Sequence, residues 1–241
     1  MDDGVTRIQC WSGPRNISTA LMYSWRQRAD TTVVDEPLYA HYLSHDDRSH
    51  PGVAQTLASQ STDPDEVIRD VILGPCATPV LYVKQMAHHL RGVDRSHLAR
   101  TENIILTRHP REMLASLSVQ LPHCDLSDTG LVECVDLLDA VLAEGGRPLV
   151  IDSQTLLGDP ASVLAELCEH VGLEFDPAML SWPAGPKPED GAWAPYWYDN
   201  VHRSSGFGPP RTTERALSPR LQPVLAEALP LYERLATYAV T

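Results

Sequence analysis

A short segment near the start of the chain, Ser12–Thr19, combines a glycine-containing turn with the first residues of a helical pattern. Such a turn leaves backbone N–H groups free and points the positive end of a helix dipole at one spot, where phosphate binds readily. Arg15 adds a full positive charge there, and the Ser18 and Thr19 hydroxyls add further donors. The segment therefore predicts an anion-binding cradle. The alternative is an N-capped helix with a surface arginine.

This cradle resembles the 5′-phosphosulfate loop of sulfotransferases that use 3′-phosphoadenosine 5′-phosphosulfate (PAPS). In that family the loop reads Pro-Lys-Ser-Gly-Thr-Thr, and its positions are occupied here by Pro14, Arg15, Asn16, Ile17, Ser18 and Thr19, preceded by Ser12 and Gly13. Arginine replaces the family's lysine, and isoleucine replaces its glycine. The NTPase P-loop, Gly-x-x-x-x-Gly-Lys-Ser/Thr, is absent from the chain.

Two later segments resemble the family's sites for the 3′-phosphate of the nucleotide. Arg108 ends a β-rich run and Ser116 follows eight residues later, which is the spacing of the family's arginine–serine clamp. A strand-end guanidinium binds phosphate in bidentate fashion, and a hydroxyl two helical turns on reaches another oxygen. The alternative is a strand–helix junction with an exposed arginine. A looser match to the family's C-terminal nucleotide loop comprises Arg203, Ser204, Ser205, Gly206 and Phe207.

Sulfuryl transfer needs positive charge at the leaving phosphate and a base for the acceptor. The resemblance assigns the first role to Arg15 and places Lys84 near the transferred group, where the alternative is a surface lysine. Glu36 precedes a proline and resembles the base of bacterial carbohydrate-type members; the alternative is a carboxylate at a helix start. Other members place a histidine two residues after the lysine, but that position is Met86 here. His88 is therefore expected to orient the acceptor or to act as an alternate base.

The elements that must position these residues alternate along the chain. Short apolar, β-rich runs at 7–10, 32–35, 80–83, 103–106 and 148–151 are separated by helical patterns at 18–28, 110–117, 131–143, 160–171 and 219–238. Such alternation predicts an α/β fold, with a parallel sheet of about five strands flanked by helices. The length suits a single domain over residues 1–241. The resemblance implies the P-loop-NTPase-like sulfotransferase fold, in which the carboxyl ends of the strands converge on the ligand.

The stretch 182–210 differs from the rest because it is rich in proline and glycine and carries six aromatic residues. Loops of this length are uncommon in compact domains unless they act as lids or binding loops. We expect this stretch to form a lid and nucleotide loop, with residues 193–198 covering the acceptor. The alternative is a linker draped over the core.

Composition narrows the classes of partner. Acidic residues outnumber basic ones 32 to 19, and the net charge of −13 argues against nucleic acid and anionic membranes as partners. No apolar run approaches the ~20 residues that span a bilayer, and residues 1–3 are acidic where a signal peptide is basic, so we expect a cytoplasmic protein. The five widely spaced cysteines predict free thiols, and the histidine spacing predicts no metal site.

These features together predict a bacterial-type enzyme that transfers a sulfuryl group from PAPS to a hydroxyl or amine of a small-molecule acceptor, releasing the 3′,5′-bisphosphate (PAP) without a metal. One alternative is a non-catalytic nucleotide-binding protein on the same fold. The other is a nucleotide kinase or NTPase, which would require the missing P-loop lysine. The sequence identifies neither the acceptor, because acceptor pockets in this family are built from variable loops, nor the oligomeric state.

Overall fold

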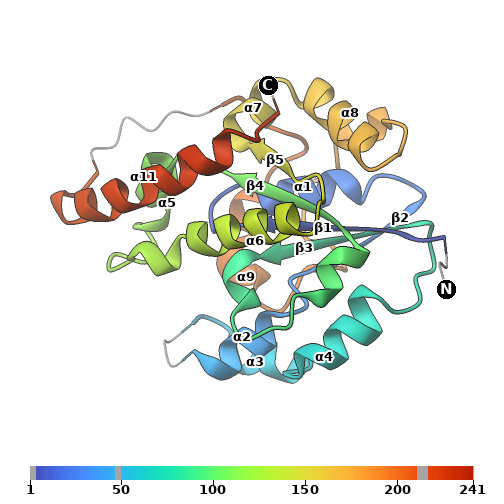
Figure 1. Cartoon of the computed structure of the whole chain (residues 1–241), viewed down its shortest axis with the longest axis horizontal. Helices are drawn as coiled ribbons and strands as arrows, with labels where there is room; N and C mark the ends of the chain where they lie inside the picture. Colours follow the sequence, from blue (N-terminus) through green and yellow to red (C-terminus); the bar gives the residue numbers. More distant parts are fainter. Residues whose placement is uncertain (1–3, 47–49, 211–216, 241) are drawn as a thin grey trace.

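A five-stranded sheet forms the centre of the computed structural model, which describes residues 4–46, 50–210 and 217–240. All neighbouring strands are parallel, in the order β2-β3-β1-β4-β5 (Figure 1). The strands are β1 (Thr6–Ser12), β2 (Thr31–Asp35), β3 (Val80–Met86), β4 (Glu102–Thr107) and β5 (Leu149–Asp152). The predicted single α/β domain with a five-stranded parallel sheet is confirmed. The acidic residues 1–3 lie outside the described residues.

Alternate side chains of each strand face two separate apolar layers. On one face, Ile104 and Leu106 pack with α1 (Ser18–Trp25) and α8 (Pro160–His170). On the other face, Ile105 packs with α6 (Leu131–Ala143) and α11 (Gln222–Ala236), and Figure 1 shows α6 crossing in front of the sheet. Because both faces are buried, the strands read as continuous apolar runs in the sequence.

Local signals set the starts of the longer helices. Proline occupies the first position of α5 (Pro110–Leu117) and of α8, where its missing N–H costs nothing. The Asp159 carboxylate caps α8 by accepting from the N–H of Ser162 at 3.1 Å. Helices α5 and α6 have the predicted bounds, whereas the predicted helix 219–238 is divided into a 3₁₀ turn and α11.

Several short elements were not predicted, because most are shorter than the window over which helical periodicity can be read. They include two helical turns inside the predicted loop 182–210, which is therefore partly helical. The elements are α2 (Tyr39–His45), α3 (Val53–Ser59), α4 (Pro64–Val67), a π-turn (Ile68–Ile72), α7 (Ser153–Gly158), α9 (Ala194–Trp197), α10 (Asp199–His202) and 3₁₀ turns at Ala87–Leu90, Ser96–Arg100, Leu126–Asp128, Pro177–Leu180 and Pro219–Leu221.

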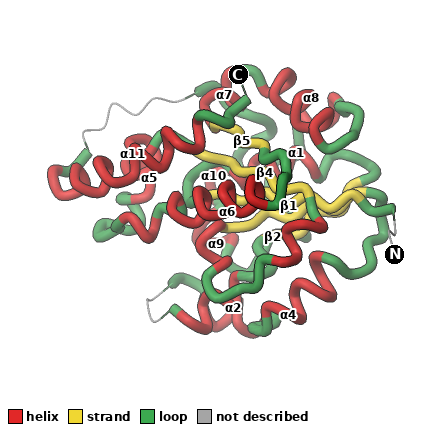
Figure 2. Tube along the Cα trace, in the orientation of Figure 1, coloured by secondary structure: helices red, strands yellow, loops and turns green. Residues whose placement is uncertain are grey.

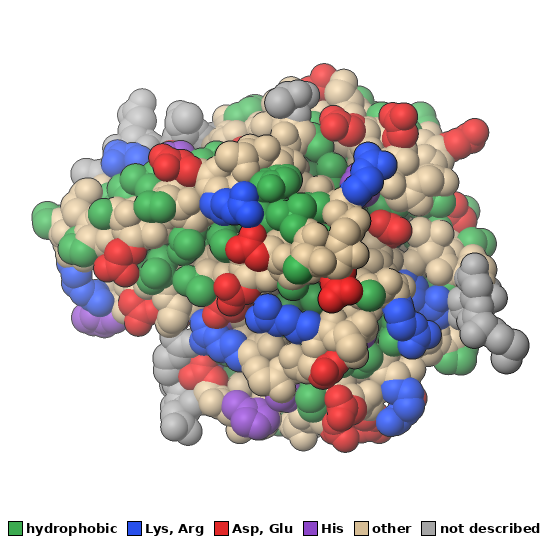
Figure 3. All heavy atoms as spheres, in the orientation of Figure 1, with side chains coloured by type: hydrophobic (Ala, Val, Ile, Leu, Met, Phe, Trp, Pro, Cys, Tyr) green, Lys and Arg blue, Asp and Glu red, His purple; other side chains and the backbone are tan. Residues whose placement is uncertain are grey.

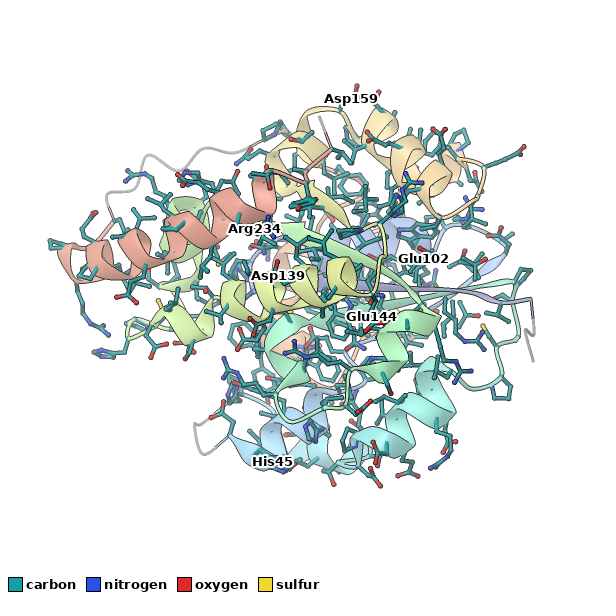
Figure 4. The ribbon with its side chains drawn as sticks, in the orientation of Figure 1. His45, Glu102, Asp139, Glu144, Asp159 and Arg234 are labelled. Atoms are coloured by element: carbon teal, nitrogen blue, oxygen red, sulfur yellow. The ribbon has the colours of Figure 1, made fainter. Side chains whose placement is uncertain are left out.

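Helix α11 lies alongside α6 on the outer side of the sheet (Figure 2). Ala228 and Leu235 of α11 are fully buried in the apolar layer that α6 also forms. At the edge of this contact, the Arg234 guanidinium donates to the Asp139 carboxylate at 2.8 Å (Figure 4). Both of these side chains are about half exposed, so the apolar burial holds the helices together and the ion pair adds little.

The surface has a mixed character (Figure 3), and the thiols are unpaired. Acidic, basic and apolar side chains are interspersed on the face drawn in Figure 3. Within the described residues, none of the helices combines the length and apolar character that crossing a membrane requires. All five cysteines are unpaired, as predicted, and four of them are buried.

The turn after β1 is held in place by a close approach between two loops. A side-chain carbon added at Gly13 would lie 2.0 Å from the backbone carbonyl oxygen of Thr129. Gly130, which has a φ of 67°, packs against the same turn, because a carbon added there would lie 3.2 Å from Cα of Gly13. Glycine at position 13 is therefore required for packing between the cradle and the segment that precedes α6.

We expect Gly13→Ala to lower the free energy of unfolding by about 1–3 kcal/mol, because the clash is with backbone and neither loop can yield cheaply. Gly158→Ala, at the end of α7, is the matched control, because a methyl group there meets nothing within 4 Å. It should change the free energy of unfolding by less than about 0.5 kcal/mol. Urea denaturation measures both variants, and equal midpoints for the two would contradict the close approach.

Candidate functional site

A cleft of about 1080 Å³ lies at the carboxyl ends of the central strands. Its walls include the loop after β1, the ends of β2 and β3, the residue after β4, the end of α5 and the segment 193–209. Sequence-predicted residues that line it are Pro14, Arg15, Asn16, Ile17, Ser18, Thr19, Glu36, Lys84, His88, Arg108, Ser116, Arg203, Ser204, Ser205, Gly206 and Phe207. The structure thus brings together residues from five separate parts of the chain.

Two predicted residues, Ser12 and Gly13, do not line the cleft and instead support the loop from behind. The Ser12 hydroxyl is fully buried and lies 3.8 Å from the sulfur of Met86 on β3. Gly13 packs against Thr129, as described above.

The loop after β1 has a backbone conformation that non-glycine residues rarely adopt. Arg15 has a φ of 64° and Ile17 a φ of 62°, both in the left-handed region. This conformation is costly for a β-branched residue, at about 1–3 kcal/mol, and such strain clusters at ligand sites. Ile17 stands where the family loop has glycine, yet it has the backbone conformation that glycine adopts freely. Left-handed residues in a turn point neighbouring N–H groups into one concavity, which binds anions.

The guanidiniums of Arg15 and Arg108 meet at one end of the cleft. Arg15 Nε donates to Ser116 Oγ at 3.0 Å, and Arg108 Nη1 donates to the carbonyl oxygen of Arg15 at 3.0 Å. The predicted 5′-phosphosulfate and 3′-phosphate sites are therefore in direct contact. Burial lowers the pKa of Arg15, and repulsion from Arg108 lowers it further. Burial also lowers the pKa of Arg108.

This end of the cleft fits an anionic group. Glu112 is the acid paired with Arg108, at 3.6 Å, while Arg108 Nε is buried without a partner among the described residues. A phosphate could accept from that N–H and would offset the repulsion between Arg15 and Arg108. The fit rests on two neighbouring guanidiniums, one of which has a buried N–H without a partner among the described residues.

A buried cluster of charges lies beyond the loop, at the ends of β2 and β3. The sheet register pairs Asp35 with Lys84, and the Lys84 ammonium lies 2.9 Å from the Asp35 carboxylate. The ammonium also donates to Glu36 and, at 2.8 Å, to the hydroxyl of Tyr198. Burial opposes the charge on Lys84, but these partners outweigh it and hold the pKa of Lys84 well above its usual value.

Glu36 combines a strained backbone with a perturbed carboxyl group. It has a φ of 42°, and its N–H donates to the carbonyl of Lys84 at 2.8 Å while its carbonyl accepts from Gln60 Nε2 at 3.0 Å. Burial raises the pKa of the Glu36 carboxyl group above its usual value, although Lys84 opposes the change. A buried carboxylate with a raised pKa at a cleft wall suits a general base.

Aromatic and imidazole rings form the wall around this charge cluster. Tyr39 stacks on His89 with ring centroids 4.7 Å apart, and Tyr42 meets the ring of His88 edge-on at 4.9 Å. Burial, with repulsion from His88 and Lys84, lowers the pKa of His89 well below its usual value, so His89 is neutral. Both histidines line the cleft; His88 is partly exposed, whereas His89 is buried.

The segment 193–209 reaches the cleft from the C-terminal part of the chain. Trp193 and Tyr198 are buried, and the indole N–H of Trp193 donates to the Tyr198 hydroxyl at 3.0 Å. Phe207 meets Trp182 edge-on with centroids 5.1 Å apart. Arg203 is exposed and donates to Asp199 on the preceding turn. The proposal that this segment moves as a lid stays a prediction.

Asp35, Tyr39 and Tyr42 at the charged end were not predicted from the sequence, and Trp193 and Tyr198 were predicted only as part of the segment over the acceptor. Asp35 carried a usable signal, because it ends a strand beside Glu36 and its neighbour across the sheet is Lys84. The only sequence signal for Tyr198 was its position in an aromatic-rich stretch. Among the described residues, no group of three or more His, Cys, Asp or Glu side chains could hold a metal ion.

A family model for the sulfotransferase domain matches residues 6–239. The chain belongs to this sulfotransferase family. Two solved structures share its fold. The sulfotransferase domain of the Synechococcus PCC 7002 olefin synthase has a TM-score of 0.58 and 18% identity, and the match covers 96% of each chain. A sulfotransferase from Alicyclobacillus acidocaldarius has a TM-score of 0.57 and 15% identity, and the match covers 96% of this chain and 94% of that one. The predicted family is confirmed, and sulfuryl transfer is supported as the general chemistry.

Two curated relatives are closer in sequence but much longer. The branched-chain-amino-acid aminotransferase-like proteins 1 and 2 of Arabidopsis thaliana are 38% identical over 232 residues and 35% identical over 229 residues. These matches include 96% and 95% of this chain, but only 42% and 41% of the plant proteins. The sulfotransferase-family chain thus spans about two fifths of the length of these relatives.

Proposed function

We propose that the protein transfers a sulfuryl group from PAPS to a hydroxyl or amine of a small-molecule acceptor. The observation that carries this proposal is the division of one cleft into two ends of different charge. Arg15 and Arg108 gather cationic donors at one end, while Glu36 and Lys84 form a carboxylate–ammonium pair at the other. The first end suits a nucleotide with two phosphate positions, and the second suits proton removal from an acceptor.

The residues at the cationic end would hold the donor. Arg108 and Ser116 bind the 3′-phosphate, and the backbone N–H groups of the loop after β1 bind the 5′ side, with Arg15 between them. PAPS supplies an activated sulfuryl group on its 5′-phosphate. Because the two phosphate positions are fixed by side chains that contact each other, the donor is oriented toward Lys84 and Glu36 at the other end of the cleft.

The residues at the other end would act on the acceptor. The Glu36 carboxylate takes the proton from the acceptor hydroxyl or amine as the new bond to sulfur forms and the bond from sulfur to the 5′-phosphate oxygen breaks. Lys84 stabilises the negative charge near the transferred group. His88, at the cleft wall, orients the acceptor. Burial of Glu36 and Lys84 keeps water from competing with the acceptor.

We expect Arg108→Ala to weaken PAP binding about tenfold to hundredfold, because the lost charge-assisted hydrogen bonds are worth ~1.5–3 kcal/mol. Ser116→Ala should have a smaller effect. Calorimetric titration with PAP measures both variants. Arg111→Ala is the matched control, because Arg111 lies near the start of the same helix but does not line the cleft. Unchanged affinity in the Arg108 variant would remove the nucleotide assignment.

We expect Glu36→Gln to lower turnover by ~10²–10⁴-fold while leaving PAP affinity unchanged, because proton removal is lost but the cationic end is intact. In the native protein, the raised pKa of Glu36 means that protonation begins at a higher pH than for an ordinary glutamate. Activity should therefore be lost on acidification above the usual glutamate range. Turnover of labelled PAPS, measured across pH with a panel of hydroxyl and amine acceptors, gives the pH at which activity is lost.

His88→Asn tests the competing assignment of the base. If the histidine variant alone loses turnover and retains PAP binding, the base is His88 and not Glu36. Tight binding of PAP without transfer to any acceptor would support a non-catalytic nucleotide-binding protein. Hydrolysis of ATP without PAPS binding would support a kinase or NTPase.

A further inference from the structure

The ammonium of Lys84 uses all of its hydrogen-bond capacity on three partners. It donates to Asp35 Oδ1 at 2.9 Å, to the Tyr198 hydroxyl at 2.8 Å and to Glu36 Oε1. A lysine ammonium has three N–H donors, so none is left over. Lys84 itself is 1% exposed, and its three partners are also buried. Lys84 is therefore held in one orientation by three residues from two segments.

The Tyr198 hydroxyl has an equally complete set of contacts, and their directions follow from the chemistry of the partners. Lys84 Nζ and Trp193 Nε1 can only donate, so the hydroxyl accepts from both. Its own proton is then donated to a carboxylate, and the Asp35 oxygens, 2.8 and 3.0 Å away, are nearer than Glu36 Oε1 at 3.5 Å. Asp35 in turn accepts from the N–H of Gly191 at 3.1 Å.

We propose that Asp35 and Tyr198 are positioning residues for Lys84, and that the segment bearing Tyr198 completes the catalytic site when it is docked at the ends of β2 and β3. Asp35 provides a second carboxylate partner that is not consumed when Glu36 takes up the acceptor proton. Tyr198, 114 residues away in sequence, sets the direction of the third N–H. The kinetic part of this inference rests on the proposed function, whereas its effect on Lys84 does not.

The charge on Lys84 depends on every group around it. Removing the Asp35 charge should lower the pKa of Lys84, because an opposite charge at this distance favours the ammonium form by ~1–3 pH units. The titratable groups that face Lys84 come from β1, β2, α2, the turn after β3 and the docked segment: Cys10, Asp35, Glu36, Tyr39, His89 and Tyr198. Among these, Asp35 and Glu36 carry the negative charge.

The chain offers a direct measurement, because Lys84 and Lys187 are its only lysines. Nuclear magnetic resonance of protein labelled at the lysine side chains should give two signals, and Lys187→Arg assigns them. In Asp35→Asn, the pKa of Lys84 should fall and the rate of transfer should be lost at a lower alkaline pH than in the native protein. In Tyr198→Phe, the Lys84 signal should shift and kcat should fall about tenfold with the KM for PAPS unchanged.

Tyr23→Phe is the matched control. Tyr23 anchors the same segment through its hydroxyl, which donates to Asp190 at 2.7 Å, but it makes no hydrogen bond to Lys84. We expect this variant to leave the Lys84 titration and kcat unchanged. If Tyr23→Phe changes them as much as Tyr198→Phe does, the tyrosines merely hold the segment and the proposal is overturned. Native-like near-ultraviolet circular dichroism in each variant verifies that it folds.

The two readouts separate this proposal from the proposed function. If the native protein shows no transfer from PAPS, the titration of Lys84 in Asp35→Asn and Tyr198→Phe still decides the positioning roles. If transfer occurs but both variants keep native rates, native pH profiles and a native Lys84 signal, the positioning roles are refuted and the proposed function stands.

Discussion

A single buried ammonium, that of Lys84, places the strongest demand on the rest of the structure. A charge removed from water costs several kcal/mol unless paired and hydrogen-bonded, and Lys84 is 1% exposed. Its partners come from the end of β2 and from a segment more than a hundred residues later in the chain. The need to satisfy this charge therefore links the sheet, Glu36 and the aromatic segment into one assembly.

The strand order separates this assembly from the cationic end of the cleft. Because β1 lies between β3 and β4, the loop after β1 stands between Lys84 on one side and Arg108 on the other. Ligands of open α/β sheets bind at the carboxyl ends of the strands, where the order of connection reverses. In the proposed function, the phosphate groups are held near β4 and the acceptor near β2, on either side of the loop after β1.

The fold persists at low sequence identity. The fold is shared with solved structures at 15–18% identity, so the layers depend on apolar patterning more than on particular residues. In the loop after β1, Ile17 has a left-handed backbone although it is β-branched. Surrounding contacts stabilise this strained backbone. For example, Asn16 Nδ2 donates to the carbonyl oxygen of Leu106 at 3.3 Å.

The sequence by itself determined the parallel sheet, the bounds of α5 and α6 and many of the cleft residues, because strand and helix periodicity and strand-end placement are local properties. It did not determine the contact between Arg15 and Ser116, the supporting roles of Ser12 and Gly13, or the short helices between residues 193 and 202. Nor did it identify Asp35 and Tyr198 as partners of Lys84. Those features arise only when segments far apart in the chain meet, because burial of a charge in a folded protein selects partners by distance and not by spacing in sequence.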